Sequence, residues 1–398
     1  MRIKRLVLLF VVVGLTASLL AACGPAPAEE TTAPPSEGEA EEEVQLDEVV
    51  IGIYQPMTGA MAAGGEQTMQ GIELAHSQKP EVLGVPVKIP LVDNRSDKAE
   101  AATAMQRLIE QEGATAVIGS YGSSLSMAGG EVAQEAGVPA IGASPTNPLV
   151  TQGNPYYFRA CFIDPFQGRV MAKYAIEELG VERVAVIQDV AQDYSVGLAS
   201  FFRSAFIEMT GDASQIVAFT SFQTGDQDFT AQLTSALGEE PDAIYAPGYY
   251  GDVALLARQA REAGFEGPLM GGDALEAPEL IEIGGEAVEN LYFSSHYHPD
   301  AELSPASRPF VEDFEAEYGE RANAFAALGY DAYMLLMDAI ERAGSFDKDA
   351  IRDALAATKD YAGATGTISM DENGDAIKDA VVLTVENGEF VYLTTVSP

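Results

Sequence analysis

The stretch from Ala114 to Ser124 reads ATAVIGSYGSS, an apolar run that leads into a loop of glycine, serine and tyrosine. The residues that follow, 125–136, are small and apolar at helical spacing. We therefore expect a buried strand at 114–118, a loop at 119–124 and a helix at 125–136. Ser123 and Ser124 stand where a helix N-cap is expected. The stretch is the strand-to-helix step of an α/β fold.

A polar loop before a helix permits two interpretations. The free N–H groups and partial positive charge of a helix N-terminus favour an anion such as a carboxylate, but the same residues could form a capping turn that binds nothing. A second such loop, 142–148 with Ser144 and Thr146, follows the next predicted strand at 138–141. Ligands of open α/β sheets bind at the carboxyl ends of strands. We therefore expect both loops to face one crevice.

Predicted strands and helices alternate on both sides of these loops. Strands are expected at 49–54 and 85–92, helices at 65–78 and 97–112, and a strand at 156–159 ends the series. A second alternating series runs from 167 to 273, with polar loops at 192–195 and 246–250. Helices at 310–318, 322–343 and 349–358 and a hairpin around Asn387-Gly388 follow. The repeated order predicts two similar three-layer α/β lobes with parallel sheets.

The composition limits the possible partners. The chain has 398 residues, enough for two domains, with 61 acidic and 22 basic side chains, a net charge of −39 and a pI of about 4.1. Such a charge repels the phosphates of nucleic acids and of an anionic membrane surface. An acidic surface is typical both of exported proteins and of proteins from saline habitats, and the sequence does not separate the two.

The N-terminus has the features of a targeting segment. Three basic residues precede an apolar run at 6–20, which is short for a transmembrane helix of ~20 residues. The run ends in Leu20-Ala21-Ala22-Cys23, which resembles a bacterial lipobox and implies cleavage before Cys23 and lipidation of its thiol. The alternative is an ordinary signal peptide with a chance cysteine. Residues 24–46 are acidic and rich in proline, which predicts an unfolded tether.

The sequence offers little for catalysis or metal binding. With only Cys23 and Cys161, a disulfide framework or a zinc ribbon is not expected. His296 and His298 lie two residues apart and could chelate a metal from one face of a strand, but no cysteine or third histidine accompanies them. Ser123 lacks the G-x-S-x-G surroundings of a hydrolase nucleophile, and no phosphate-binding glycine motif is present. We predict that the protein is not an enzyme and that it binds neither a metal ion nor a cofactor.

From about Val49 onward the chain resembles the leucine/isoleucine/valine-binding proteins, the substrate-binding components of ABC amino-acid importers. The shared motifs, in order, are Tyr54 to Gly59 (YQPMTG), Asp93, Ile118-Gly119 with the serine loop, Gly137-Val138-Pro139, Ser144-Pro145-Thr146, Gln192-Asp193-Tyr194, Gly248-Tyr249, Arg258 to Gly264 and Gly271-Gly272-Asp273. The resemblance implies a type I periplasmic binding protein, in which two lobes close over a ligand. The crossings are expected near 159–165, 293–299 and 366–375. Lobe 1 would be 47–162 plus 297–368, and lobe 2 163–296 plus 369–398.

The resemblance also implies a ligand site made of Ser123, Ser144, Thr146, Tyr194, Tyr249 and Asp273. Ser123 and Thr146 correspond to residues that hold the α-carboxylate of an amino acid, while Ser144 corresponds to a contact of its ammonium group. Asp273 corresponds to the acidic residue that pairs with that ammonium; it could instead cap a helix at 277–283. The two tyrosines correspond to aromatic residues of the second lobe, or serve only in packing.

Two departures from the family leave the ligand's side chain open. Many members carry an aromatic residue near Ala63, where this chain has Met61-Ala62-Ala63, and the disulfide of some members is missing. The sequence thus predicts a monomeric, lipid-anchored extracytoplasmic receptor that delivers an amino acid, branched-chain by resemblance, to a permease with a separate ATPase. The alternative is a sensor for an amide, urea or other small molecule that signals through a partner.

Overall fold

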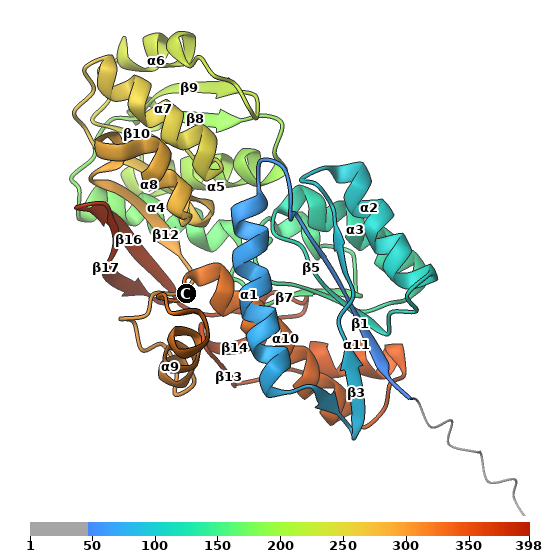
Figure 1. Cartoon of the computed structure of the whole chain (residues 1–398). Coiled ribbons are helices and arrows are strands. Elements are labelled where there is room, and N and C mark those ends of the chain that lie inside the picture. The colour runs from blue at the N-terminus through green and yellow to red at the C-terminus, as the bar shows by residue number, and fades with distance from the viewer. Residues whose placement is uncertain (1–46) are drawn as a thin grey trace, which may run out of the picture. The chain divides into compact units, whose positions relative to one another are not determined.

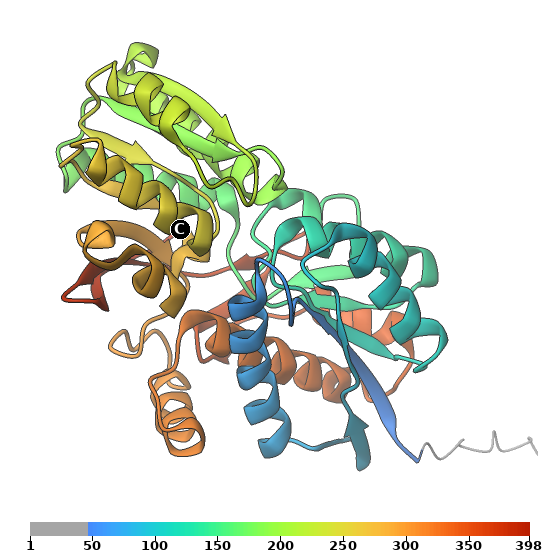
Figure 2. The same cartoon turned by 45° about the horizontal axis from the view of Figure 1, so that its top comes forward.

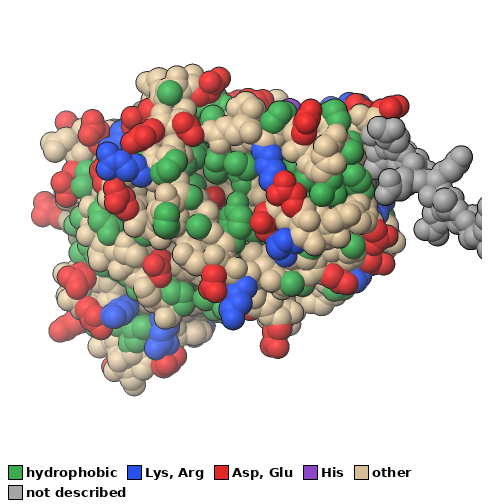
Figure 3. Space-filling view, turned by 90° about the horizontal axis from the view of Figure 1, so that it is seen from below, with side chains coloured by type: hydrophobic (Ala, Val, Ile, Leu, Met, Phe, Trp, Pro, Cys, Tyr) green, Lys and Arg blue, Asp and Glu red, His purple; other side chains and the backbone are tan. Residues whose placement is uncertain are grey.

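The computed structural model describes residues 47–398, which form two α/β lobes (Figures 1 and 2). The predicted leader at 1–23, with Cys23, and the predicted tether at 24–46 lie outside the described residues. None of the described helices is long and apolar enough to span a membrane. Acidic side chains are spread over the face in Figure 3, with a smaller number of lysines and arginines between them.

The first lobe is built on a seven-stranded sheet in the order β2-β3-β1-β5-β6-β7, with β4 also paired to β1. Its strands are β1 (Val49–Gln55), β2 (Glu81–Val82), β3 (Val85–Lys88), β4 (Leu91–Asp93), β5 (Ala116–Gly119), β6 (Ala140–Gly142) and β7 (Tyr157–Arg159). Every residue of β1 is buried, as expected for a parallel strand covered on both faces. Helices α2 (Lys98–Glu110) and α3 (Ser123–Ala136) cover one face, and α1 (Ala62–Gln78) and α10 (Ala324–Ala343) cover the other.

The second lobe repeats this plan with the sheet order β17-β16-β12-β11-β10-β8-β9. Its strands are β8 (Val184–Asp189), β9 (Ile216–Phe222), β10 (Ala243–Tyr245), β11 (Leu269–Gly271), β12 (Leu291–Ser295), β16 (Ala380–Glu386) and β17 (Glu389–Val396). Helices α4 (Asp164–Glu177) and α5 (Asp193–Thr210) pack together beside the sheet, and α6 (Thr230–Leu237), α7 (Tyr250–Glu262) and α8 (Pro278–Gly284) also flank it. The expected parallel sheets are mostly parallel; β2, β16 and β17 pair antiparallel.

The chain passes between the lobes three times, as Figure 1 shows: from β7 to α4, from β12 to α9 (Ser307–Tyr318), and into β16. After α10 come α11 (Lys348–Ala356) and a small sheet of β13 (Tyr361–Gly363), β14 (Gly366–Met370) and β15 (Ala376–Ile377). The two-lobed α/β fold is confirmed, whereas the exact lobe boundaries at 162, 296 and 368 remain a prediction.

A buried ion pair ties the first crossing to the third. Arg159 ends β7 and is fully buried, and its Nε lies 2.7 Å from Oδ1 of Asp375. Its Nη2 donates to the Thr151 hydroxyl, which in turn donates to Asp375. Its Nη1 donates to the carbonyls of Pro145 and Asn147 at 2.7 and 3.0 Å. The crossing therefore also holds the second polar loop in place.

Several predicted boundaries were wrong, for local reasons. The segment 85–92 forms two strands, β3 and β4, which pair with β1 in one register and are separated by Ile89 and Pro90; proline has no N–H to donate to the ladder. Helix α5 begins at Asp193, inside the predicted loop at 192–195, and α7 begins at Tyr250, inside the loop at 246–250. The N-cap of α3 is Gly122, with a positive φ of 92°, so neither Ser123 nor Ser124 is the cap that was expected.

Candidate functional site

The two polar loops of the first lobe leave the same sheet edge. β5 and β6 pair in parallel through Val117 and Ala140, so their carboxyl ends lie side by side. Ser123, the first residue of α3, accepts a hydrogen bond on its Oγ from the backbone N–H of Asn147 at 3.1 Å. The expectation that both loops face one crevice fits this geometry.

The predicted residues of the second lobe also follow the carboxyl ends of parallel strands. Tyr194 lies in the first turn of α5 after β8, Tyr249 directly precedes α7 after β10, and Asp273 follows β11. The rings of Tyr194 and Tyr249 have centroids 5.5 Å apart, and all three side chains are buried. The fold thus brings together residues that lie up to eighty positions apart in the chain.

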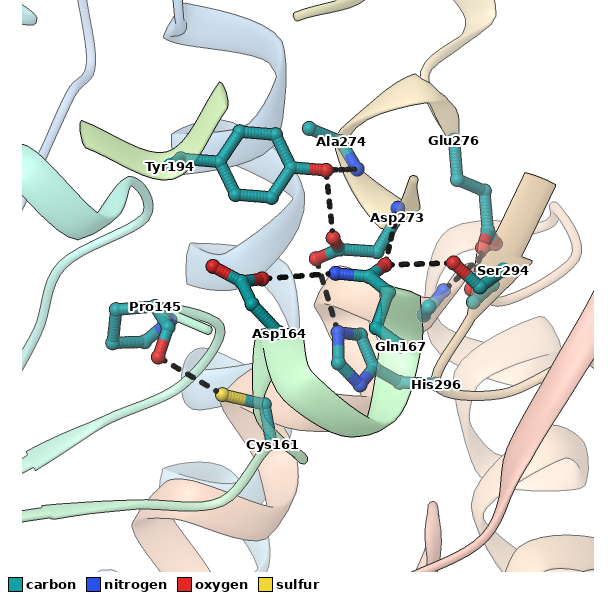
Figure 4. Close-up of polar contacts among 12 residues, drawn as sticks. Pro145, Cys161, Asp164, Gln167, Tyr194, Asp273, Ala274, Glu276, Ser294 and His296 are labelled. Atoms are coloured by element: carbon teal, nitrogen blue, oxygen red, sulfur yellow. Dashed lines mark hydrogen bonds and ion pairs between the residues drawn. The ribbon is translucent and has the colours of Figure 1, made fainter. Parts of the chain in front are cut away.

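Asp273 is the centre of a hydrogen-bond network, drawn in Figure 4. Tyr194 donates its hydroxyl to Oδ1 at 2.9 Å, and Nε2 of His296 lies 3.0 Å from Oδ2. The backbone N–H of Asp273 donates to Oε1 of Gln167 at 2.9 Å. Gly272 permits this packing, because a Cβ there would lie 2.5 Å from the Tyr194 hydroxyl. The predicted alternative, in which Asp273 caps α8, is wrong, since that helix has no side-chain cap.

Both side chains that bind the Asp273 carboxylate are neutral. Burial lowers the pKa of His296 more than its carboxylate neighbour raises it, so Nε2–H donates as an uncharged imidazole. Burial raises the pKa of Tyr194 well above its ordinary value. Among the described residues, His296 is the only basic side chain within ion-pair distance of Asp273. The negative charge is hydrogen-bonded but not neutralised.

The histidines do not form a metal site with their neighbours. His296 binds Asp273 and stacks on Phe162, with ring centroids 3.8 Å apart, whereas His298 lies near Asp300 and the carbonyl of Phe390. Within residues 47–398, no three His, Cys, Asp or Glu side chains are arranged to hold a metal ion. Cys161 is buried and donates its S–H to the Pro145 carbonyl, and burial raises the pKa of its thiol, as expected for a packing residue rather than a nucleophile.

A second carboxyl group lies beside the first. Asp164 begins α4, and its Oδ1 accepts a hydrogen bond from Nε2 of Gln167 at 3.1 Å. The side-chain oxygen of Gln167 accepts the backbone N–H of Asp273 (Figure 4). Oδ2 of Asp164 has no partner among the described residues. Burial, and then the charge of Asp273, raise the pKa of Asp164 to about 7. The Gln167 amide therefore links the carboxyl group of Asp164 to the backbone of Asp273.

Several hydroxyl groups around the cleft are buried and unpaired. Within residues 47–398, Ser144 Oγ, Thr146 Oγ1, Tyr121 Oη and Tyr249 Oη make no hydrogen bond. A buried polar group without a partner costs about 1–3 kcal/mol, and native proteins leave few of them. Three of these four belong to residues predicted to hold a ligand. The Thr146 hydroxyl lies near the Asp164 carboxyl group, whose pKa it lowers, and a polar ligand would supply partners for Ser144 and Tyr249.

An aromatic wall closes the cleft at the point where the sequence lacked one. The ring of Tyr121 packs so tightly over Gly64 that a Cβ on that glycine would lie 2.4 Å from it. It also meets the ring of Phe325 edge-on at 4.8 Å and that of Tyr249 at 5.8 Å. Next to Ala63, where many family members carry an aromatic residue, Gly64 is thus covered by a ring from the serine loop.

The lobes touch across the cleft through Asp193. Its Oδ2 lies 2.7 Å from Lys98 Nζ and accepts the Ser124 hydroxyl at 2.9 Å. Its N–H donates back to Ser124 Oγ at 3.1 Å, and its carbonyl accepts from Asn147 Nδ2 at 2.7 Å. Because Lys98, Ser124 and Asn147 all belong to the first lobe, these contacts describe a closed arrangement. We call these four residues the rim contact.

Comparison with known proteins identifies the family. The model of the periplasmic binding proteins matches residues 48–389. The chain belongs to this family. Within it, the chain is similar to the Leu/Ile/Val-binding protein homolog 3 of Brucella melitensis, with 30% identity covering 82% of this chain and 88% of that one.

Solved structures of periplasmic binding proteins agree with this assignment. The leucine-binding protein LivK of Thermotoga maritima has 49% identity and a TM-score of 0.85. The match covers 88% of this chain and 99% of LivK. LivJ of Streptococcus pneumoniae, a branched-chain amino acid transporter substrate-binding protein solved with isoleucine, has 34% identity and a TM-score of 0.82, over 88% of this chain and 100% of that one. These relatives bind substrates for transporters and are not enzymes, so the prediction of a non-enzymatic binding protein is confirmed. The family implies an extracytoplasmic location.

Sequence reasoning missed four residues of the network. The sequence analysis gives Tyr121 no role within the serine loop, places Asp164 only in the first crossing, and takes Gln167 only as the start of a helix. His296 was considered as a metal ligand and instead binds Asp273. The one available signal was the pairing of Asp164 and Gln167, two polar residues at i and i+3 of a helix that is otherwise packed inward.

Proposed function

We propose that the protein is the lipid-anchored substrate-binding component of an ABC importer, which holds an amino acid between its lobes and delivers it to a permease with a separate ATPase. The expected ligands are the branched-chain amino acids. The observation that carries the proposal is the buried Asp273 carboxylate, whose hydrogen-bond donors are neutral. A buried charge without a counter-charge is costly, and the ammonium group of an amino acid supplies one through a charge-assisted hydrogen bond.

The other end of an amino acid suits the first lobe. Ser123 is the first residue of α3, where a carboxylate is favoured, and its Oγ is bonded by the N–H of Asn147, in the loop that carries Ser144 and Thr146. A ligand with an anionic end on this lobe and a cationic end on Asp273 would bridge the two. Neutral ligands such as amides or urea would leave Asp273 unpaired, which disfavours the alternative of an amide sensor.

A thermal-shift screen against the twenty amino acids and common amides tests the proposal. A ligand that binds only the folded protein raises its melting temperature, by an amount that corresponds to about 2.7 kcal/mol at a hundredfold excess over Kd. We expect a subset of neutral aliphatic amino acids to raise the melting temperature. A screen in which only amides, or nothing, shifts the transition would contradict the proposal.

The lipid anchor is a separate part of the proposal, and it rests on Leu20 to Cys23 alone. Metabolic labelling with palmitate is expected to mark the wild-type protein in membrane fractions, and Cys23→Ala is expected to lose the label. Because Cys161 is buried, Cys161→Ala is the matched control and should keep it. An unlabelled wild type would remove the anchor from the proposal without affecting ligand binding.

A further inference from the structure

The phenol of Tyr121 has no role in the site described so far. The side chain is 2% exposed, and its hydroxyl has no hydrogen-bond partner among the described residues. Two other buried tyrosines of the same lobe have partners: Tyr157 donates to the carbonyl of Gly119 at 2.6 Å, and Tyr333 donates to that of Lys79 at 2.8 Å. Buried tyrosine hydroxyls usually find a partner, so this one requires an explanation.

The ring of Tyr121 lies next to the second lobe, with its centroid 5.8 Å from that of Tyr249. Apart from burial, the groups that raise its pKa are Tyr249, Tyr250, Asp273 and Glu279, and all of them belong to the second lobe. Its ring rests on Gly64 and Phe325 of the first lobe. Because burial raises its pKa well above the ordinary value, the hydroxyl stays protonated and can both donate and accept a hydrogen bond.

The neighbouring phenol, that of Tyr249, lies next to Gly122. Its hydroxyl is 3.2 Å from the position that a Cβ would take on Gly122, next to Ser123. That is where the α-carboxylate is expected. With Ser123 and Tyr249 at the carboxylate and Asp273 at the ammonium, Tyr121 is left to meet the side chain of the ligand.

We infer that Tyr121 gives this site a preference for amino acids whose side chain carries a hydrogen-bonding group, so that threonine binds more tightly than its isostere valine. The inference rests on the proposed function and refines its ligand. An aliphatic side chain fits the aromatic wall but leaves the Tyr121 hydroxyl buried and unpaired. A site that presents a buried hydrogen-bonding group discriminates strongly against a ligand that lacks the partner.

Calorimetric titration of the wild-type protein with L-threonine and L-valine tests the sign of the preference. The two ligands have nearly the same shape, so their difference isolates the hydroxyl group. We expect threonine to bind more tightly by on the order of tenfold. Valine binding as tightly as threonine, or more tightly, would overturn the inference. If neither amino acid binds and the thermal-shift screen finds none that does, the proposed function itself fails.

Tyr121→Phe tests the assignment to this residue, because it removes only the hydroxyl. Threonine should lose its advantage, while valine should bind as before or better. The matched control is Tyr297→Phe, since the Tyr297 hydroxyl is also buried and unpaired among the described residues but its ring packs against Phe310 instead of Tyr249. An unchanged ratio in Tyr121→Phe, or the same loss in Tyr297→Phe, would overturn the assignment. Thermal melts establish that each variant folds, and the wild-type comparison stands without them.

Discussion

In the proposed function, Asp273 pairs with the ammonium group of the ligand. Asp273→Ala should weaken binding of the identified amino acid by about 2–5 kcal/mol, the scale for truncating one member of a buried charged pair. Because the residue lines the cleft, the fold should survive. Calorimetric titration measures the loss of affinity. Asp212→Ala serves as the control, because Asp212 is an exposed carboxylate that caps the short helix Ala213–Gln215. Near-wild-type affinity would exclude Asp273 as the ammonium partner and favour an uncharged ligand.

Asp164 should make stability depend on pH. Its pKa is raised from 3.8 to about 7 in the folded protein, so the folded state holds a proton that the unfolded chain has released. This contribution to stability is fully present below the unfolded pKa and is lost as pH rises through about 7. The free energy of unfolding should therefore fall with pH in this window, by up to ~1.4 kcal/mol per unit.

Asp164→Asn provides the comparison, since an amide does not titrate. Urea unfolding at pH 5, 6, 7 and 8 should show a smaller decrease in the variant than in the wild type. Glu276 and Asp252, with pKa values raised by burial to about 7 and about 6, act in the same direction in both proteins and cancel in the difference. Identical slopes would show that Asp164 is ionised in the folded protein.

At the level of single residues, the sequence predicted the polar atoms that follow strands but not those that support them. Ser123, Thr146 and Asp273 stand at strand ends, where local position suggests a role. Tyr121 packs against Phe325, which lies more than a hundred residues away in the sequence. His296 binds Asp273, which lies about twenty residues away. No local pattern specifies such pairs.

Helices α1 and α10 pack closely backbone to backbone in the core of the first lobe, and a substitution at their contact can test this packing. A Cβ on Gly71 would lie 1.8 Å from the carbonyl oxygen of Ala326. Gly71→Ala must therefore push the helices apart, and overpacking of this kind costs typically ~1–3 kcal/mol. Urea denaturation should show this loss in the free energy of unfolding.

Gly251→Ala is the matched control for this change. Gly251 also lies in a helix, α7, but a Cβ there would meet no atom within 4 Å. Alanine restricts the unfolded chain and favours the helix, so this variant should gain up to about 1 kcal/mol. Equal effects of the two substitutions would contradict the close packing of α1 and α10.

The N-terminus of α5 is capped from the other lobe. Its own N-cap residue, Gln192, makes no side-chain cap bond, whereas Ser124 of α3 accepts the N–H of Asp193. Ser124→Ala should remove a cap that exists only in the closed form, a loss of about 1 kcal/mol. Ligand affinity should then fall several-fold, mainly through faster dissociation, which stopped-flow fluorescence measures. Ser204→Ala, whose hydroxyl bonds within α5 itself, should leave dissociation unchanged.

Elements were predicted better than their ends. The amphipathic helix at 97–112 was confirmed as α2, and Asp97 caps it by accepting the N–H groups of Ala99 and Glu100. The early start of α5 was missed because its cap comes from Ser124, a residue distant in sequence. Local capping signals cannot reveal a cap that a different lobe supplies.

For the whole molecule, the prediction concerns closure. The proposed ligand residues are divided between lobes that meet at the rim contact, so a ligand that binds both lobes should shift the population to the closed state. Small-angle scattering should show a smaller radius of gyration at saturating ligand than without it. A double variant, Asp273→Ala with Ser123→Ala, should show no such change. An equal radius in the wild type with and without ligand would count against hinge closure.

The interleaved path of the chain determines when each lobe can be completed during synthesis. A ribosome that has released residue 296 has supplied most of the second sheet, but β12 still lacks its neighbour β16 at Ala380–Glu386. The first sheet is complete at Arg159, yet one of its faces waits for α10 at Ala324–Ala343. Both lobes therefore remain unfinished until the last hundred residues emerge. The growing chain should stay extended and accessible to translocation machinery, and it should fold only when its C-terminal third has been delivered.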